Sequence, residues 1–466
     1  MMSGILPLRS SDSDRLPLAA LALAMLLPSL GTSIANVALP TLAAAFRAPM
    51  AHVQWVVIAY LLAVTTLIVG AGRVGDVLGR RRILLVGIGL FAIASAAAVL
   101  AQDLWQLVVL RAVQGLGAAM MMALTVASVS DLVPEDRTGR AMGLLGTMSA
   151  VGTALGPSLG GLLIDALGWP AVFGFMAAAG TGVFALCQYA LPSEPTVTRK
   201  AVASFDWPGM LLLTLSLGAY ALAGTLGLAA SGLASAGLVA ISVIALALFV
   251  AVERRAERPL VDLASLRNRV LAGGLVAMGL VSTVMMATLV VGPFYLTGVL
   301  GLGPAQTGLA MSVGPVVAAL VGVPAGRLVE RRGERQVTTA GLLAVTGGSV
   351  LMLLLPASFG LAGYLSSLTI ITGGFALFQA ANSTRVMKTA SADRRGVTSA
   401  LLGLSRNLGL ITGASAMGAV FAFGSRGVAM FGSGTGGEAG LQATFAMAAL
   451  LAAAALAVSC LGRGGR

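Results

Sequence analysis

The sequence predicts an all-α polytopic membrane protein, and three observations lead to this prediction. Of the 466 residues, 58% are hydrophobic and only 10% are charged, whereas soluble domains are about 25% charged. A soluble fold could not bury so much apolar surface, and a disordered chain would need the opposite composition. The apolar residues form runs of membrane-spanning length, and the basic residues cluster between alternate runs.

Fourteen apolar runs, separated by charged or turn-rich breaks, each approach the roughly 20 residues that a membrane-spanning helix needs. In chain order the spans are expected at 17–39, 53–72, 83–101, 104–127, 141–164, 171–191, 208–228, 232–252, 270–297, 305–325, 336–355, 359–381, 397–423 and 440–462. Of the 29 Lys and Arg residues, 25 lie in the two termini and in the loops after the even-numbered spans. This distribution predicts that both termini are cytoplasmic. The net charge of +12 therefore indicates topology, not a nucleic-acid surface.

A ten-residue pattern occurs once in each half of the chain. Gly72–Arg81 (GRVGDVLGRR) follows span 2, and Gly326–Arg335 (GRLVERRGER) follows span 10. Both segments fit G-R-x-x-acid-x-x-G-x-R, which makes spans 1–6 the counterpart of spans 9–14. The residues expected to act in gating are Gly72, Asp76, Gly79 and Arg80 in the first copy and Gly326, Glu330 and Gly333 in the second.

The repeat also divides the chain into three parts. Residues 1–200 are expected to form an N-terminal six-helix bundle and residues 270–466 a C-terminal six-helix bundle. Residues 201–269 are expected to hold an inserted helix pair, spans 7 and 8, with a linker. Parallel repeats of this kind are typical of transporters that bind substrate near the membrane midplane, between the two halves.

Five further segments extend the pattern beyond the repeat. They are Leu110–Gly117 (LRAVQGLG), Gly152–Gly161 (GTALGPSLGG), Ile34–Pro40 (IANVALP), Asp206–Gly209 (DWPG) and Arg258–Leu263 (RPLVDL). With Gly72–Arg82, they make the chain resemble the fourteen-span drug:proton antiporters of the major facilitator superfamily, EmrB/QacA type. The resemblance implies the major facilitator fold, two six-helix bundles plus the inserted pair. It also identifies motif A at 72–82, motif B at 110–117 and motif C, the antiporter motif, at 152–161.

Motif A has two possible roles. Its glycines permit close approach of the backbone, and the Asp76 carboxylate can accept hydrogen bonds from the N-terminus of a neighbouring helix. The resemblance implies a latch that closes the cytoplasmic side in the outward-facing state. The alternative is a solvated turn whose arginines only set the topology. We favour the latch because the acid-plus-glycine pattern recurs around Glu330.

Motif C places small residues along one face of span 5. Gly152, Gly156 and Gly160 are spaced four residues apart, Gly161 follows them, and Pro157 removes a backbone hydrogen bond. This face is expected to pack closely against span 1 or against a helix of the other half. The resemblance adds that it seals the leak across the membrane and favours antiport.

Two arginines, Arg111 and Arg406, fall inside predicted spans. A charge at the centre of a span costs about 2.5–3.5 kcal/mol on insertion scales, so each guanidinium must be paired within the protein. Arg111 is expected to face the cavity, with Gln114 one turn away sharing its partner. Each arginine is either a substrate-anchoring or proton-gating group, or a strut that donates to backbone carbonyls; the first role is favoured for Arg111.

The resemblance places spans 1, 4, 9 and 12 around the cavity. The residues on these spans that are expected to bind substrate are Ser33, Asn36, Tyr295, Phe378, Gln379 and Asn382. A mostly apolar pocket with a few polar anchors suits the recognition of amphipathic molecules. Ordinary packing is the alternative for each aromatic residue.

One departure from the family concerns Gly31, which occupies a position where an aspartate is common. None of the 17 acidic residues lies in the middle of a predicted span. Export of a cation against 100 mV costs about 2.3 kcal/mol and normally needs a buried acid. Two embedded arginines without an embedded acid instead favour neutral or weakly acidic amphiphiles. Proton coupling is expected through Asp76, Asp131, Asp165 or a titrating substrate.

The sequence therefore predicts a multidrug-type secondary transporter of the bacterial inner membrane that exports small amphipathic compounds by alternating access and proton antiport. An uncoupled facilitator or importer of a metabolite is the first alternative, and a non-transporting membrane sensor is the second. No enzyme is expected, because no nucleophile–base pair or phosphate loop is present. No metal site, no cofactor besides the coupling proton, no nucleic acid and no obligatory protein partner are expected.

Overall fold

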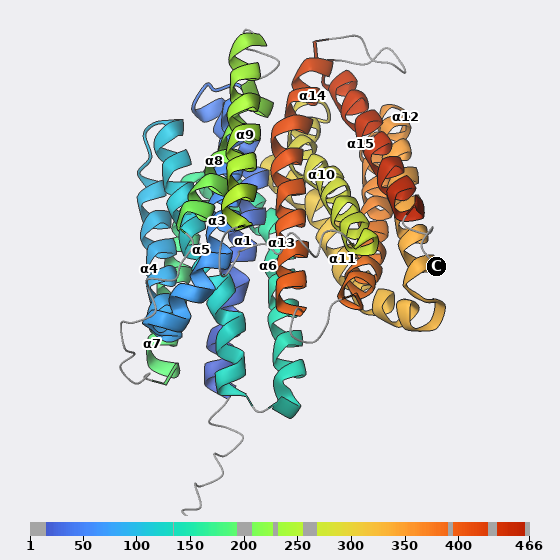
Figure 1. The fold of residues 1–466 in the computed structure, drawn as a ribbon. Helices are drawn as coiled ribbons and strands as arrows, with labels where there is room; N and C mark the ends of the chain where they lie inside the picture. Colours follow the sequence, from blue (N-terminus) through green and yellow to red (C-terminus); the bar gives the residue numbers. More distant parts are fainter. Residues whose placement is uncertain are drawn as a thin grey trace, which may run out of the picture.

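The computed structural model describes residues 15–133, 135–192, 207–226, 232–254, 268–389, 395–426 and 436–461, and every regular element in these ranges is a helix (Figure 1). The first group of helices comprises α1 (Arg15–Ala45), α2 (Met50–Val53), α3 (Trp55–Leu78), α4 (Arg80–Val99), α5 (Leu104–Leu132), α6 (Glu135–Leu167) and α7 (Pro170–Ala190). The helices α8 (Trp207–Leu226) and α9 (Gly232–Glu253) follow. The last group comprises α10 (Arg269–Gly298), α11 (Pro304–Arg332), α12 (Glu334–Met387), α13 (Arg395–Thr412), the π-helical turn η4 (Gly413–Met417), α14 (Gly418–Gly424) and α15 (Gly436–Leu461).

The predicted all-α membrane architecture is confirmed. Within the described residues, 12 helices are long and apolar enough to cross a membrane, and α8 has a shorter apolar stretch, Pro208–Ala223. The 54-residue α12 is interrupted at Gly360, whose φ is 51°. Gly341 lies against Gly374, and Gly348 lies against Ile371, so the segments before and after Gly360 run antiparallel. The fourteen-span count stays a prediction.

The helices pack as two groups with an added pair. In the first group α1 packs along α6, α3 along α5, and α4 along α5 and α7. In the second group α10 packs along α13 and α15, and α12 along α11 and α15. The groups meet where α6 contacts α11 and where α1 contacts α10, while α8 contacts both α3 and α13 (Figure 1). The domain boundaries stay a prediction, but this packing brings a helix of the inserted segment against both groups.

The repeated motif forms the same turn twice. Gly79 separates α3 from α4 with φ 98° and ψ 123°, and Gly333 separates α11 from α12 with φ 81° and ψ 152°. Both backbone amides donate to a carbonyl four residues earlier, at 2.9 Å. Only glycine adopts this region without strain, which explains why the pattern keeps a glycine at each position.

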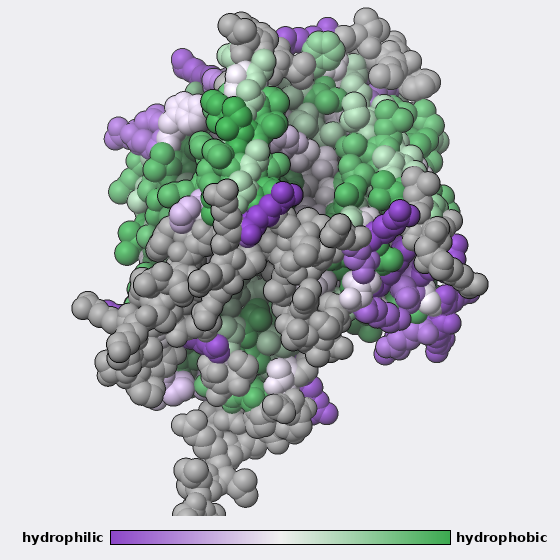
Figure 2. Space-filling view, in the orientation of Figure 1, coloured by the Kyte–Doolittle hydropathy of each residue, from purple (hydrophilic) through white to green (hydrophobic). Residues whose placement is uncertain are grey.

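The flanks of the molecule are apolar, as a lipid-facing surface requires. The helix α9 exposes large aliphatic side chains: Val239, Ile241, Val243, Ile244, Leu246 and Leu248. Figure 2 shows described hydrophobic residues covering much of this face. In water such a surface would be a strong association site, whereas in a bilayer it needs no protein partner.

Motif C packs against helices of both groups. A Cβ on Gly152 would overlap the Leu26 carbonyl of α1, and a Cβ on Gly156 would overlap the Ser33 side chain. Gly161 lies instead against Gly308 of α11. Small residues therefore let α6 approach α1 within its own group and α11 across the groups.

The packing of α6 predicts different effects for two glycines of the same helix. Gly156→Ala is expected to destabilise the protein by about 1–3 kcal/mol, because the added methyl group overpacks the contact with α1. Gly146→Ala is the matched control, since no atom lies within 4 Å of its Cβ position. Thermal unfolding in detergent would measure both, and equal midpoints for the two variants would contradict the close α1–α6 contact.

Candidate functional site

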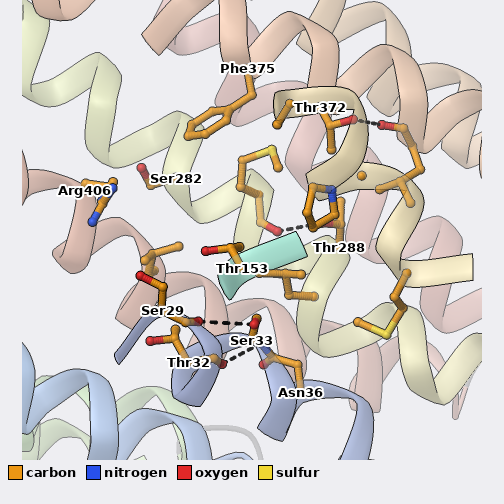
Figure 3. A pocket seen from close by; sticks show the side chains of 18 of the residues that line it. Ser29, Thr32, Ser33, Asn36, Thr153, Ser282, Thr288, Thr372, Phe375 and Arg406 are labelled. Atoms are coloured by element: carbon orange, nitrogen blue, oxygen red, sulfur yellow. Dashed lines mark hydrogen bonds between the residues drawn. The ribbon is translucent and has the colours of Figure 1, made fainter. Parts of the chain in front are cut away.

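A cavity of about 240 Å³ lies between the two groups of helices. The first group contributes α1, α5 and α6, and the second contributes α10, α11, α13 and the segment of α12 after Gly360 (Figure 3). The described residues that line it are Ser29, Thr32, Ser33, Asn36, Met122, Ser149, Thr153, Ser282, Met285, Thr288, Leu289, Met311, Gly314, Pro315, Ala318, Tyr364, Leu368, Thr372, Phe375, Arg406 and Leu410. This lining combines apolar side chains with many hydroxyl groups, one amide and a guanidinium.

The cavity is closed at one end by the contact between the groups. Gly161 of α6 and Gly308 of α11 approach closely there. At the other end, α11 ends at Arg331 and Arg332. About one and a half turns earlier, Gly326 has no neighbouring atom within 4 Å of the position that a Cβ would occupy, so no other described helix packs on it. Gly146 in the first half of α6 is equally open. Motif C therefore contributes Gly161 to the contact between the two groups, at the end of α6 remote from the arginine-rich ends of the helices, and its sealing role stays a prediction.

Most hydroxyl groups of the lining donate to the backbone of their own helix. Thr32 Oγ1 donates to the Pro28 carbonyl at 3.0 Å, and Thr153 Oγ1 donates to the Ser149 carbonyl at 3.0 Å. Similar bonds hold the hydroxyls of Ser33, Thr288 and Thr372. These bonds use the single proton of each hydroxyl and leave oxygen lone pairs to accept from a ligand.

Four polar atoms of the lining residues behave differently, because they have no hydrogen-bond partner within the described structure. They are Arg406 Nε, Ser282 Oγ, Tyr364 Oη and Asn36 Oδ1. The side chains of Ser282, Tyr364 and Asn36 are completely buried. An unpaired buried polar atom costs about 1–3 kcal/mol, so these atoms mark where a ligand can supply partners.

The helix that carries Arg406 is held firmly against α10. Ser405 Oγ donates to the Leu275 carbonyl at 2.5 Å, and Thr283 Oγ1 donates to the Gly409 carbonyl at 3.1 Å. The π-helical turn η4 then begins at Gly413, close to the Thr283 backbone. These contacts fix the α13 backbone on both sides of Arg406.

Arg111 has a different environment and does not line this cavity. Its guanidinium donates to the Val56 carbonyl at 2.9 Å, to Gln114 Oε1 at 2.5 Å and to the Gly31 carbonyl at 3.0 Å. The Tyr60 ring stacks on the guanidinium with 4.3 Å from Cζ to the ring centroid. Arg111 is completely buried and ties α1 and α3 to α5.

Gln114 extends this network to two more helices. Its Nε2 donates to Ser95 Oγ of α4 at 2.7 Å and lies 3.6 Å from Met176 Sδ of α7. Motif B in this structure is therefore an internal strut of the first group. Gly31 takes part through its carbonyl, and a side chain there would press on the Phe91 ring and the Tyr60 hydroxyl at 3.3 Å.

Of the six predicted substrate-binding residues, Ser33 and Asn36 line the cavity. Tyr295 lies behind the lining and stacks on Tyr364, with 5.9 Å between ring centroids. The Phe378 backbone packs against Gly341 within α12.

Gln379 and Asn382 lie near the end of α12 and are not among the lining residues. Asn382 Nδ2 donates to the Gly274 carbonyl at 3.0 Å, beside a small crevice that Arg269 and Arg385 also line. These two residues, with Tyr295 and Phe378, keep their binding roles only as predictions. The structure does not bring them to the cavity.

Several residues that line the cavity were not identified from the sequence. Ser149 and Thr153 lie four residues apart on α6, and Ser282, Met285 and Leu289 lie on one face of α10. Stripes of hydroxyl groups at helical spacing were the signal that could have found them. The spans numbered 5, 10 and 13 therefore line the cavity together with spans 1, 4, 9 and 12.

The residues predicted to act in gating lie at the arginine-rich ends. Arg80 Nη1 donates to the Ala127 carbonyl of α5 at 2.8 Å, and Glu330 is exposed. Gly72 has open space around its Cβ position, as Gly326 does. The side chain of Asp76 lies outside the described residues, so the latch stays a prediction.

Among the described residues, no group of three or more His, Cys, Asp or Glu side chains is arranged to hold a metal ion.

The Arg111 network predicts a role in stability. Arg111→Met is expected to lower the folded yield and the thermal midpoint in detergent, since each buried acceptor that loses its donor costs about 1–3 kcal/mol. Arg426→Met is the control, because Arg426 is exposed. An Arg111→Met protein as stable as the wild type, with altered transport alone, would contradict the strut.

The comparisons with known proteins agree with this architecture. The family model described as "Major Facilitator Superfamily" matches residues 21–414. The chain is 29% identical over 405 residues to "Riboflavin transporter RibZ" of Clostridioides difficile (86% of this chain, 87% of the relative). It is 32% identical over 412 residues to "Multidrug resistance protein Stp" of Mycobacterium tuberculosis (87% of this chain, 76% of the relative).

Solved structures show the same fold. A bacterial homologue of the human lysosomal transporter Spinster, in an inward-facing and unoccupied conformation, superposes with a TM-score of 0.71 at 16% identity. That comparison covers 97% of both chains. With the family match across most of its length, the chain belongs to the Major Facilitator Superfamily.

Proposed function

We propose that the protein is a multidrug-type secondary transporter of the fourteen-span drug:proton antiporter group. It exports small amphipathic organic compounds, with a preference for neutral or weakly acidic ones. The observation that supports this most is the cavity between the two groups of helices, with an apolar lining, many hydroxyl groups and a guanidinium. A lining of this kind suits compounds that differ in shape but share an apolar body and a few polar groups.

Alternating access follows from the one-sided closure of the cavity. The positive-inside rule places the arginine-rich ends in the cytoplasm, and the Gly161–Gly308 contact then lies toward the outer side, which supports an inward-facing conformation. Export then requires this seam to open while the arginine-rich ends close. The named relatives include a multidrug resistance protein, which supports the export direction.

The substrate preference follows from the charges at the cavity. Arg406 is the only charged residue among the described lining residues. A cationic drug would meet this guanidinium without a compensating carboxylate, and like charges in a low-dielectric site repel strongly. Neutral and weakly acidic amphiphiles avoid that cost.

Proton coupling is assigned to acids outside the cavity or to the substrate itself. Of the three candidate aspartates, Asp165 is the one whose side chain the structure describes; it is exposed near the end of α6, beside the Gly161–Gly308 contact. A Cβ on Gly303, the residue that caps α11, would lie 3.8 Å from Asp165 Oδ1. Asp165 therefore lies beside the beginning of α11, where the two groups of helices meet, and this position supports it as the coupling residue.

A second candidate function is facilitated transport of a metabolite. The named riboflavin transporter, 29% identical to this chain, supports it. The two functions differ in direction and coupling, and the same cavity would serve both.

A growth-inhibition panel in an efflux-deficient bacterial host tests the proposal. Cells that express the wild type should resist neutral and acidic amphiphiles more than quaternary cations, because Arg406 disfavours a cation in the cavity. Strain controls would carry the empty vector. Best protection against quaternary cations would contradict the substrate preference, and protection against no compound would favour the metabolite facilitator.

Coupling through Asp165 can be tested in proteoliposomes. Asp165→Asn is expected to reduce efflux driven by a pH gradient by about tenfold or more while substrate exchange without a gradient continues, since only the coupled step uses the proton. Glu438→Gln, at the beginning of α15, is the matched control. Unchanged gradient-driven efflux in Asp165→Asn would exclude this residue as the coupling site.

A further inference from the structure

We infer that Arg406 and Ser282 form an anion-binding subsite, and that the preferred substrate carries one acidic group, such as a carboxylate, which binds there. This inference rests on the proposed function, because it concerns the same cavity. It goes further by assigning one end of the substrate to one wall of the cavity.

The first step is the contrast between the two arginines. The Arg111 guanidinium makes three hydrogen bonds and stacks on Tyr60. The Arg406 guanidinium has no hydrogen bond or ion pair to any described residue, and its Nε is buried. Both arginines belong to spans, where an unpaired guanidinium is costly. Arg111 is satisfied by the protein, whereas Arg406 needs an acceptor from elsewhere.

The second step is the hydroxyl group beside Arg406. Ser282 is fully buried, and its Oγ has no partner within the described structure. Ser282 and Arg406 both line the cavity, and Figure 3 shows them on the same side of it. Gly409, three residues beyond Arg406, lies against Ser282, so the α10–α13 contact brings the backbone of Arg406 and that of Ser282 to the same wall of the cavity. A planar carboxylate can accept from the guanidinium fork and from a nearby hydroxyl together.

The third step is the opposite wall. There the hydroxyls of Thr32, Ser33 and Thr153 already donate to backbone carbonyls, so they offer acceptor lone pairs. Asn36 Nδ2 donates to the Thr32 carbonyl at 3.1 Å, while its Oδ1 has no donor. In Figure 3 the α1 residues Thr32, Ser33 and Asn36 lie away from Arg406. This wall fits O–H or N–H groups of a substrate.

Between these polar groups the lining is largely apolar. Its large apolar side chains include Met122, Met285, Leu289, Met311, Leu368 and Phe375. The substrate class that fits all three zones is an apolar, ring-containing compound with an acidic group at one end and hydrogen-bond donors at the other. Flexible methionines accommodate different ring shapes without changing the polar ends.

Three dansyl compounds that share the fluorophore and differ in the terminal group, and so in charge, test this assignment. They are dansylglycine, which is an anion at pH 7.5, its neutral amide, and dansyl-ethylenediamine, a cation. Their fluorescence reports binding to the purified full-length protein in detergent. We expect dansylglycine to bind about tenfold more tightly than the amide, because only the carboxylate pairs with Arg406. The cation should bind most weakly of the three.

The variants localise the effect. Arg406→Gln should reduce dansylglycine affinity about tenfold and leave amide affinity within about twofold, since only the charge-assisted bonds are lost. Ser282→Ala should weaken the acid by a smaller factor, and Arg406→Lys should be intermediate because lysine lacks the planar fork. Arg385→Gln is the matched control, because Arg385 lines the separate crevice at the end of α12.

The outcomes separate this inference from the proposed function. Equal affinity of the acid and the amide in the wild type would overturn the subsite, as would an acid preference that survives Arg406→Gln or binding of none of the three compounds. If Arg406→Gln did not fold, Ser282→Ala and Arg406→Lys would decide by the same measurement. Selective acid binding without efflux of any dansyl compound from proteoliposomes would contradict export and leave the subsite intact.

Discussion

Within a bilayer, a buried polar group must find its partner inside the protein, and this constraint organises the structure. Backbone groups are satisfied by helices, and most Ser and Thr side chains near the cavity donate to their own helix. Arg111 meets the constraint through carbonyls of α1 and α3, Gln114 and the Tyr60 ring. Arg406 does not meet it among the described residues, and it lines the cavity. Other buried polar atoms also lack a partner in the described structure, but Arg406 combines this with a charge and a place in the cavity lining, and this exception supports a ligand there.

Close contacts at glycines determine where the helix that carries Arg406 lies. The Gly161–Gly308 contact holds the two groups of helices together at one end and leaves the cavity between them. The Gly409–Gly279 contact brings α13 onto α10 beside Ser282. Because lipid provides no hydrophobic drive between helices, such small-residue contacts determine how closely helices approach. A binding site made from two halves depends on them as much as on the residues that line it.

The sequence was sufficient for the helical architecture, because apolar run length and charge placement report directly on the membrane. It also indicated the repeat, and the matching turns at Gly79 and Gly333 agree with that reading. Ser33 and Asn36 were correctly expected at the cavity, because they lie on the face of α1 that is turned toward the second group of helices. The pattern of apolar residues along α12 did not predict how deep each residue lies in the membrane or which face of the helix turns toward the cavity. Phe378 and Asn382 were therefore expected in the cavity, whereas they lie about one and two turns beyond its last α12 lining residue, Phe375.

The same limit applies to the two arginines. The position of each arginine within its span predicted its depth in the membrane but not the direction of its side chain. The rotation of the helix about its own axis determines whether that side chain packs between helices of one group or lines the cavity. The measurement that tests the role of unpaired polar groups most directly is an experimental structure with dansylglycine bound. The carboxylate is predicted to lie within hydrogen-bond distance of Arg406 and Ser282, with the Arg111 network unchanged. A carboxylate bound elsewhere, with Arg406 still unpaired, would contradict this role.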